Sequence, residues 1–482
     1  MSSIKKEIIK GSIWIAIAKY SGIVIQLLIT AVLSRLISPS AFGTIAVAMV
    51  ILHFLNIFAD IGIGPAVVQY KQLHKHHLDS LFTLNVYIGI VLSSVLFLLG
   101  GFVADYYADK TLVRVCQMMS LVILFHSFNV VPNALMRKDK RFKTIAIRTL
   151  FFQVLSGVIA IWGAFHSWGI YALLVSPILT AIGVFCVNYY NYPLSYVARM
   201  SSEAVSIVSS YSFFQFAFSF VNYFSRNLDK LIIGKYFSLT QLGYYDKSYH
   251  LMMLPLQNVT FVIEPVLHPI LSSLQDNKHE LAEKNRELAV IISNFSFPIG
   301  LILYFCGAEI INIFYGNQWN AAIPVFKILA LSLPLQMILS TSGAIYQAAG
   351  KTKLMFIGGI LNSSVTVGGF LVAAHFFKSL ESIAWAWDVT LIINFINSYV
   401  ILYRYVLVES GLNFYRTLLP QLLNTAIVFI LLWILTNLTT GMNLFLMLFL
   451  KVFVAIALTI IMAEITHQYK ISTLLKNFKR RI

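Results

Sequence analysis

The sequence predicts an all-α polytopic membrane protein with fourteen transmembrane helices, built as two pseudo-symmetric six-helix lobes followed by helices 13 and 14. Three observations predict this fold class. Hydrophobic residues make up 59% of the chain and charged residues only 11%, whereas soluble domains carry about 25% charged residues. Apolar runs long enough to cross a bilayer recur from end to end. The chain also resembles itself at an offset of 200 residues.

The expected transmembrane helices follow one another with short connections. Each run is long enough for the roughly 20 residues that a helix needs to cross the hydrocarbon core. We interpret the first run as an uncleaved helix rather than a signal peptide, because it stays apolar as far as Leu33. The runs fall at 12–34, 42–64, 81–104, 113–135, 146–165, 169–191, 208–236, 244–271, 288–307, 322–348, 354–376, 382–403, 417–438 and 443–465.

Lysine and arginine residues mark one side of the membrane. They gather at the N-terminus, in the connections after even-numbered helices and in the tail at 467–482, which we expect on the anionic inner leaflet. The other connections hold far fewer: Arg35, Lys110, Lys235 and Lys378. This asymmetry predicts that both termini are cytoplasmic. It also accounts for the formal charge of +16, which therefore does not indicate a nucleic-acid-binding protein.

An internal repeat predicts the division into lobes. LISPSAFG at 36–43 aligns with YFSLTQLG at 236–243, so that Gly43 matches Gly243. Because six helices separate the halves, the repeats have parallel topology and are related by an axis along the membrane normal. A cargo site is then expected between the lobes near the middle of the membrane. The predicted divisions are 1–192 for the N-terminal lobe, 193–404 for the C-terminal lobe, 405–466 for helices 13 and 14, and 467–482 for the tail.

A polar stripe on the seventh helix predicts a water-filled cavity. Its polar residues recur at steps of three and four, so they share one helical face, and facing lipid would cost several kcal/mol per polar group. The offset of 200 maps Asn222 and Arg226 onto Gly22 and Gln26, next to Lys19. The cations would hold the anionic part of a cargo. The predicted cavity residues are Lys19, Gln26, Asn222, Arg226 and Lys230.

The acids of these helices have two interpretations each, a coupling role and a structural one. Asp229 lies three residues after Arg226, so the two side chains could pair with each other. Glu264 adjoins Pro265, where a structural hydrogen bond competes with a coupling role. Asp60 lies in DIGIGP, where a role at a helix end is favoured over ion coupling.

The sequence predicts no metal site, no cofactor and no enzymatic activity. His74, His76 and His77 lie among lysines in a cytoplasmic connection without cysteine. The chain has no HExxH, GxSxG or P-loop motif. KHELAEKNRE at 278–287 is expected to form a short cytoplasmic amphipathic helix. RKDKRFK at 137–143 is a topology signal that could also gather anionic lipid or cargo phosphates.

Three stretches carry a family resemblance: ISPSAFGTIAVAMVILHFLNIFADIGIGPAVVQ, LDKLIIGKYFSLTQLGYYDKSYHL and IFYGNQWNAAIPVFKILAL. They resemble the polysaccharide-transporter branch of the multidrug/oligosaccharidyl-lipid/polysaccharide exporter superfamily, especially Wzx-like flippases of bacterial inner membranes. The resemblance covers essentially the whole chain. In one departure, some relatives carry arginine in helix 1, where this chain has Lys19 and Gln26.

The resemblance implies that the chain moves an undecaprenyl-diphosphate-linked oligosaccharide to the periplasmic leaflet for O-antigen, capsule or exopolysaccharide assembly. A cationic cavity would take the diphosphate and sugar, and the lipid tail would stay in the bilayer or in a groove that can involve helices 13 and 14. Membrane lipids and the pathway's polymerase and glycosyltransferases are the implied partners.

Two other functions are weighed against this one. A drug or metabolite antiporter of the same superfamily should have an acidic or aromatic cavity, whereas helices 1 and 7 carry three bases and one acid. A membrane-embedded polysaccharide polymerase needs a large catalytic loop, and no connection is long enough for one.

Overall fold

The computed structural model describes residues 3–60, 62–70, 72–197, 201, 223, 227–272, 274–275, 277–438 and 441–465. For residues 3–10, 12, 259–266, 268–270 and 463 it describes the backbone alone. All regular structure in these ranges is helical. The chain divides into two compact units, Met1–Gly243 with Phe314–Gln318 (unit 1) and Tyr244–Ile313 with Trp319–Ile482 (unit 2).

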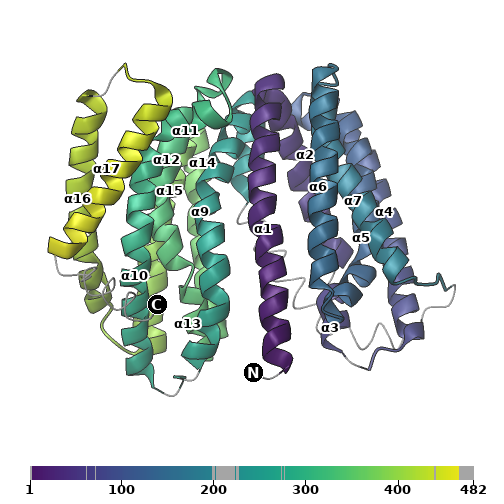
Figure 1. Cartoon of the computed structure of the whole chain (residues 1–482), viewed down its shortest axis with the longest axis horizontal. Helices are drawn as coiled ribbons and strands as arrows, with labels where there is room; N and C mark the ends of the chain where they lie inside the picture. Colours follow the sequence, from purple (N-terminus) through teal and green to yellow (C-terminus); the bar gives the residue numbers. More distant parts are fainter. Residues whose placement is uncertain are drawn as a thin grey trace. The chain divides into compact units, whose positions relative to one another are not determined.

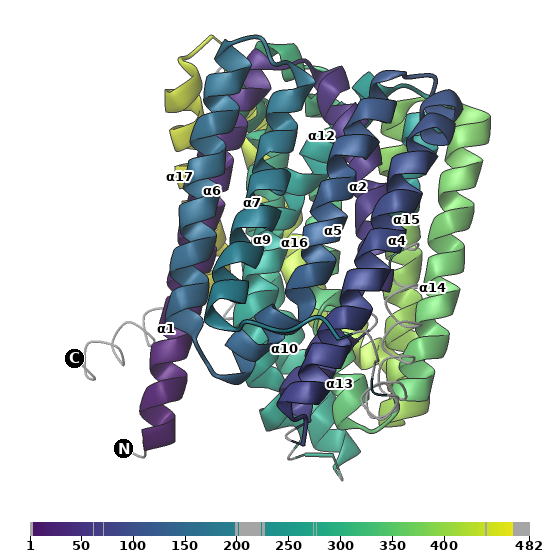
Figure 2. The same ribbon diagram turned by 90° about the vertical axis from the view of Figure 1, so that its right-hand side faces the viewer.

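Unit 1 is a bundle of long helices with one short helix inserted (Figures 1 and 2). Helix α5 is central, because α2, α3, α4 and α7 all pack against it, while α6 joins α1 to α7. A buried apolar cluster that includes Leu81, Val131 and Ala134 holds α3, α4 and α5 together. The helices are α1 (Ser3–Leu36), α2 (Pro39–Asp60), α3 (Ile63–Gln69), α4 (Lys75–Tyr107), α5 (Thr111–Lys138), α6 (Phe142–Phe165) and α7 (Ile170–Asn191).

Unit 2 is built in the same way, with α10 and α12 packed together and α15 joining α12 to α14. Helices α16 and α17 pack on α10 through a cluster that includes Leu301, Val428 and Ala455. Its elements are α9 (Leu239–Ser272, which begins in unit 1), α10 (Lys278–Phe305), α11 (Gly307–Phe314, whose last residue belongs to unit 1), η1 (Asn317–Trp319, which enters unit 2 only at Trp319), α12 (Ala322–Leu339), α13 (Ser342–Ala348), α14 (Thr352–Val372), η2 (Ala373–Phe377), α15 (Leu380–Ile401), η3 (Leu402–Leu407), α16 (Gly411–Leu438) and α17 (Leu444–Ile465).

Within the described ranges, 12 helices are long and apolar enough to cross a membrane. The chain is therefore a multi-pass membrane protein, and the all-α fold class is confirmed. Two further spans are expected from the sequence. The one at 208–236 lies largely outside the described residues, and the one at 244–271 lies within α9. The count of fourteen and the lobe boundaries stay predictions.

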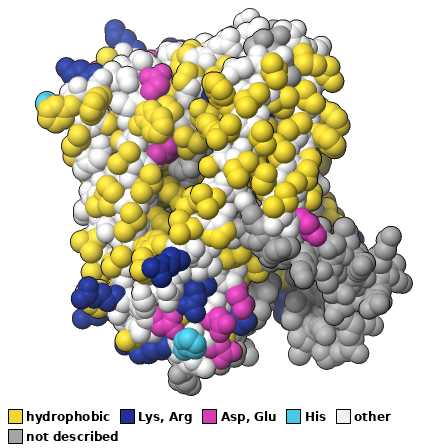
Figure 3. Space-filling model, turned by 90° about the vertical axis from the view of Figure 1, so that its left-hand side faces the viewer, with side chains coloured by type: hydrophobic (Ala, Val, Ile, Leu, Met, Phe, Trp, Pro, Cys, Tyr) yellow, Lys and Arg dark blue, Asp and Glu magenta, His cyan; other side chains and the backbone are white. Residues whose placement is uncertain are grey.

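Large apolar side chains on the outside of the helices fit a lipid environment. On the face drawn in Figure 3, hydrophobic side chains cover the middle, and charged side chains gather mostly toward the two ends. Phe449 and Phe453 of α17 are examples of exposed apolar side chains, at 71% and 62% exposure. In water such a surface would favour aggregation, whereas in a bilayer it meets lipid tails.

The two repeat-related glycines lie against each other in unit 1. A Cβ atom on Gly43 would come within 1.7 Å of Leu239 O, and one on Gly243 within 2.1 Å of Pro39 O. Pro39 and Leu239 are themselves separated by the offset of 200. The contact is thus reciprocal, as in a two-fold interface. It supports the alignment that the sequence repeat predicts at this point.

The expected short helix at 278–287 is wrong, because these residues are the first turns of α10. The Asn277 side chain begins the helix by accepting a hydrogen bond from Glu280 N at 3.1 Å. Between Lys278 and Pro298, which comes only at the sixth turn, the chain contains neither glycine nor proline. Nothing therefore stops the helix at the edge of the apolar run.

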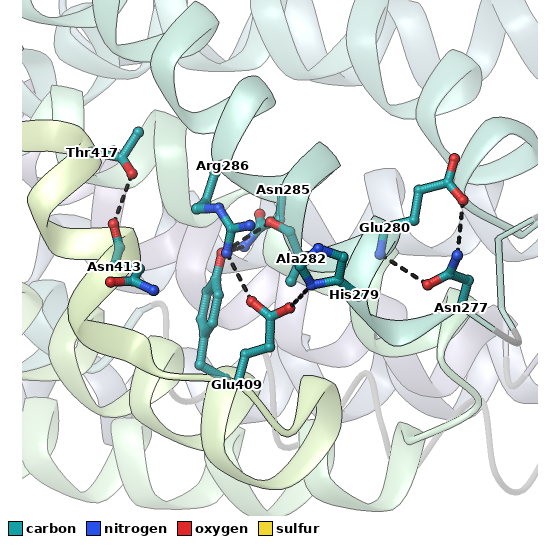
Figure 4. A network of polar contacts seen from close by, with 10 residues as sticks. Asn277, His279, Glu280, Ala282, Asn285, Arg286, Glu409, Asn413 and Thr417 are labelled. Atoms are coloured by element: carbon teal, nitrogen blue, oxygen red, sulfur yellow. Dashed lines mark hydrogen bonds and ion pairs between the residues drawn. The ribbon is translucent and has the colours of Figure 1, made fainter.

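Glu409 ties the start of α10 to the connection before α16 (Figure 4). Its carboxylate lies 2.8 Å from Arg286 Nη1 and 2.5 Å from His279 Nδ1. Burial alone would raise the pKa of the Glu409 carboxyl, but the hydrogen bonds from Arg286 and His279 outweigh it, so the pKa lies below its usual value. The ionised carboxylate therefore stabilises the folded protein.

Replacing Glu409 with glutamine should destabilise the protein at neutral pH by about 1 kcal/mol or less, since the pair is partly exposed. This loss is fully present above the pKa of the unfolded chain, about 4.3, and should vanish as the pH falls through the lower folded-state pKa. Thermal unfolding in detergent at several pH values measures it. Glu287→Gln is the control, because the Glu287–Lys284 pair is well exposed. Equal melting shifts for both variants at neutral pH would contradict the assignment.

Candidate functional site

The structure describes only part of the predicted cavity. Asn222 and Arg226 lie outside the described residues, and so does the expected pairing of Arg226 with Asp229. Glu264 lies in α9, where the backbone alone is described. Lys19, Gln26, Asp229 and Lys230 can be placed, and all four belong to unit 1.

The predicted face of α1 is partly covered by α6. Gln153 of α6 donates from Nε2 to Gly22 O at 2.8 Å. Lys19 is half-buried and Gln26 is exposed, with Gln26 Nε2 lying 3.4 Å from Thr30 Oγ1. Because Gly22 shares this face with Lys19 and Gln26, α6 covers part of the stripe and leaves the end near Gln26 open.

The helical segment 227–236 buries an acid and brings a base close to α2. Asp229 is 1% exposed, and its Oδ1 accepts a hydrogen bond from Lys230 N at 2.8 Å. Earlier in the chain, the Tyr223 hydroxyl donates a hydrogen bond to Val50 O of α2. The half-buried Lys230 side chain is close enough for its charge to act on His53 of α2.

A line of ionisable side chains continues from there through unit 1. Lys230 acts on His53, His53 interacts with His126 of α5, and His126 interacts with Asp60 at the end of α2. Both histidines are exposed. Ionisable groups in the membrane interior are expensive unless they face water or one another. The line is therefore the part of unit 1 best suited to a hydrated path.

The line ends in a polar pocket of about 550 Å³ between α2, α3 and α5. Asp60 shapes its wall, because Asp60 Oδ1 accepts from Gly64 N at 2.9 Å where α3 begins. This is the helix-end role that the sequence favours for Asp60. The lining residues are Asp60, Gly64, Pro65, Val68, Gln69, His126, Asn129, Val130, Asn133, Ala134 and Arg137.

Sequence reasoning missed the α5 side of this pocket. His126, Asn129, Asn133 and Arg137 follow one another at steps of three, four and four, the same periodicity that marks the stripe on the seventh helix. This spacing alone predicts a polar face on α5. It is weaker than the stripe because only one of the four residues carries a permanent charge.

Unit 2 buries an ion pair and a single carboxyl group that the sequence analysis does not identify. Lys451 of α17 lies 2.6 Å from Glu309 of α11, and both side chains are almost fully buried. Asp388 of α15 is 5% exposed and lies beside Ser332 of α12. Unit 2 also has an apolar groove of about 400 Å³ between α10, α12 and α16, whose lining includes Phe297, Pro334 and Phe429.

Known proteins resemble this chain along most of its length. A family profile described as "Polysaccharide biosynthesis protein" matches residues 32–324. The teichuronic acid biosynthesis protein TuaB of Bacillus subtilis is 24% identical over 431 residues, 88% of each chain. The lipopolysaccharide biosynthesis protein WzxC of Escherichia coli is 24% identical over 446 residues, 89% of each chain.

A solved structure shows the same fold. The lipid II flippase MurJ in an inward closed conformation superposes with a TM-score of 0.75 at 16% identity, over 94% of this chain and 98% of that one. At this identity the likeness concerns the fold. The helical arrangement described above is thus one that a membrane flippase uses.

Proposed function

The chain belongs to the polysaccharide biosynthesis protein family, which confirms the resemblance that its motifs indicate, and from this premise we propose that it is a flippase. Its cargo is an undecaprenyl-diphosphate-linked oligosaccharide, moved across the bacterial inner membrane for surface polysaccharide assembly. The names of TuaB and WzxC, two relatives that the chain matches over nearly nine-tenths of its length, support this cargo class.

The observation that carries the proposal is the line of ionisable side chains inside unit 1. His53 and Asp60 of α2 and His126 of α5 lie within or at the end of membrane helices, and the charge of Lys230 acts on His53. Such groups mark substrate or ion paths in membrane proteins. A lipid headgroup with diphosphate and sugar needs a path of this kind, because each of its polar groups would cost several kcal/mol in hydrocarbon.

The two ends of the cargo need different surroundings. Lys19, Lys230 and Arg226 supply cations for the diphosphate, since charge-assisted hydrogen bonds to phosphate are the strong ones. The apolar groove between α10, α12 and α16 in unit 2 suits a polyprenyl tail. Helix α16 is the thirteenth span expected from the sequence, so the groove involves one of the two helices expected after the repeat.

Alternating access is the proposed mechanism. The cargo headgroup enters from the cytoplasmic leaflet, binds to the cations and leaves on the periplasmic side. Asp229 and Glu264 are candidates for coupling transport to an ion. A drug antiporter of the same superfamily is the second candidate, and the excess of bases on helices 1 and 7 disfavours it.

Replacing Lys230 with glutamine should lower surface polysaccharide at least about tenfold, because a lost hydrogen bond to a charged group costs about 1.5–3 kcal/mol. The test is complementation of a strain that lacks this chain, with polysaccharide measured per unit of membrane-inserted protein. Lys353→Gln is the matched control, since Lys353 is exposed in the first turn of α14. Full polysaccharide in the Lys230 variant would remove Lys230 from the cargo path.

The cargo itself is tested with purified protein in liposomes. The proposed flippase should move undecaprenyl-diphosphate-linked saccharide between leaflets, and an efflux-deficient host expressing it should gain no drug resistance. Drug efflux without lipid movement would favour the antiporter.

A further inference from the structure

The polar pocket of unit 1 has the chemistry of a sugar site. It lies between α2, α3 and α5, apart from the cations that the proposed function assigns to the diphosphate. We propose that this pocket binds hydroxyl groups of the saccharide part of the cargo. This inference rests on the proposed function and adds to it the residues that contact the sugar.

Two amide side chains that line the pocket accept hydrogen bonds from buried residues of neighbouring helices. Asn129 Oδ1 accepts a hydrogen bond from Asn188 Nδ2 at 2.7 Å, and Asn133 Oδ1 accepts one from Arg148 Nη2 at 2.8 Å. Asn188 of α7 and Arg148 of α6 are both buried, at 0% and 6% exposure. With the two oxygens occupied, the NH2 groups of Asn129 and Asn133 remain as donors toward the pocket.

The acceptors come from the other wall. One oxygen of Asp60 is held by Gly64 N, which leaves the second oxygen as an acceptor. His126 and Gln69 also line the pocket and can accept or donate. Donors and acceptors therefore line the same pocket, and Asn129, Asn133 and Asp60 are each held in place by a hydrogen bond to another protein group.

The balance of charge favours a sugar over a phosphate. Asp60 and Arg137 are the acid and the base of the lining, and their formal charges cancel. A hydroxyl group both donates and accepts, so it can satisfy an amide and a carboxylate in turn. A diphosphate only accepts, and the Asp60 carboxylate would repel it. Val130, Ala134 and Pro65 add an apolar wall that suits the C–H face of a sugar ring.

The size and place of the pocket agree with this role. Its volume of about 550 Å³ falls within the roughly 300–1,000 Å³ of small-molecule sites. Arg137 lies at the end of α5, next to the basic connection that the base count predicts to be cytoplasmic. A lipid-linked saccharide made in the cytoplasmic leaflet would meet this end of unit 1 first.

The test measures how much the sugar adds to binding. Full-length protein in lipid nanodiscs is titrated with undecaprenyl diphosphate and with undecaprenyl-diphosphate-linked saccharides extracted from the native strain lacking this chain. Asn133→Asp removes an amide donor while keeping an oxygen for Arg148, and Asp60→Asn removes the carboxylate charge while keeping an oxygen for Gly64. Asn413→Asp is the matched control, because Asn413 is exposed in unit 2.

Each pocket variant should bind the saccharide-bearing lipid about three- to tenfold more weakly, as expected for one lost hydrogen bond, while its affinity for undecaprenyl diphosphate and its melting temperature stay unchanged. The control should match the wild type. An unchanged affinity for the saccharide-bearing lipid in both pocket variants would overturn the sugar site and leave the flippase proposal standing. Failure of the wild type to bind either lipid would overturn the flippase proposal and the sugar site with it.

Discussion

Replacing Lys451 with methionine is expected to destabilise the protein by about 3–5 kcal/mol. Lys451 Nζ lies 2.6 Å from Glu309 Oε1 and 3.0 Å from Phe305 O, and the two side chains are 4% and 3% exposed. The methionine would leave the Glu309 carboxylate buried without a cation, and its Oε2 already lacks a hydrogen bond. An uncompensated buried charge is costly because the interior screens it poorly.

Thermal and denaturant unfolding of the full-length protein in detergent measure this loss of stability. Adding Glu309→Gln to Lys451→Met should restore most of the stability, because the double change removes both charges together. The same lysine-to-methionine change at the exposed Lys353 is the control. A Lys451 variant that melts like the Lys353 variant would show that the pair contributes no net stability.

Replacing Gly243 with alanine is expected to destabilise the protein by about 3 kcal/mol, the upper part of the usual range for overpacking. The new methyl group would lie 2.1 Å from Pro39 O, and a backbone atom cannot turn away as a flexible side chain can. The first turn of α9, which belongs to unit 1, would have to move away from Pro39. We expect a lower melting temperature and less folded protein in the membrane.

Gly101→Ala is the comparison variant, and we expect it to change the stability in the opposite direction. Gly101 lies in α4, and a Cβ atom there would meet nothing within 4 Å. In the interior of a helix, alanine is favoured over glycine by about 0.5–1 kcal/mol. The Gly101 variant should therefore be neutral or slightly stabilised, measured by fluorescence-detected melting of both proteins. If Gly243→Ala behaves in the same way, the reciprocal glycine contact does not constrain the two helices.

Much of the fold could be predicted because each membrane helix is recognisable from the high hydrophobicity of its own segment. The boundaries were harder. The expected span at 322–348 is two helices, α12 and α13, that meet near Ser340, and α3 was not expected as a separate helix. The start of α10 is also placed wrongly by the sequence. Hydropathy identifies only the apolar part of a helix, and the first turns of α10 are amphipathic.

The candidate site could be predicted only where residues close in sequence share a face. The stripe on the seventh helix and the weaker one on α5 are both periodic. Glu309 and Lys451, in contrast, are separated by 142 residues, and no periodicity links them. The hydrogen bonds from Arg148 and Asn188 that fix the two pocket amides also come from other helices. Such contacts depend on which helices become neighbours.

The segment Phe314–Gln318 changes how the chain can be divided. It lies in unit 1, where Ser34 Oγ donates to Phe314 O and Gln318 Nε2 donates to Ser34 O and Ile37 O. The polypeptide therefore passes between the units three times, after Gly243, Ile313 and Gln318. A gene cut at residue 243 would give a first half that lacks part of its own fold. Unit 1 is therefore complete only when the second part of the chain supplies Phe314–Gln318.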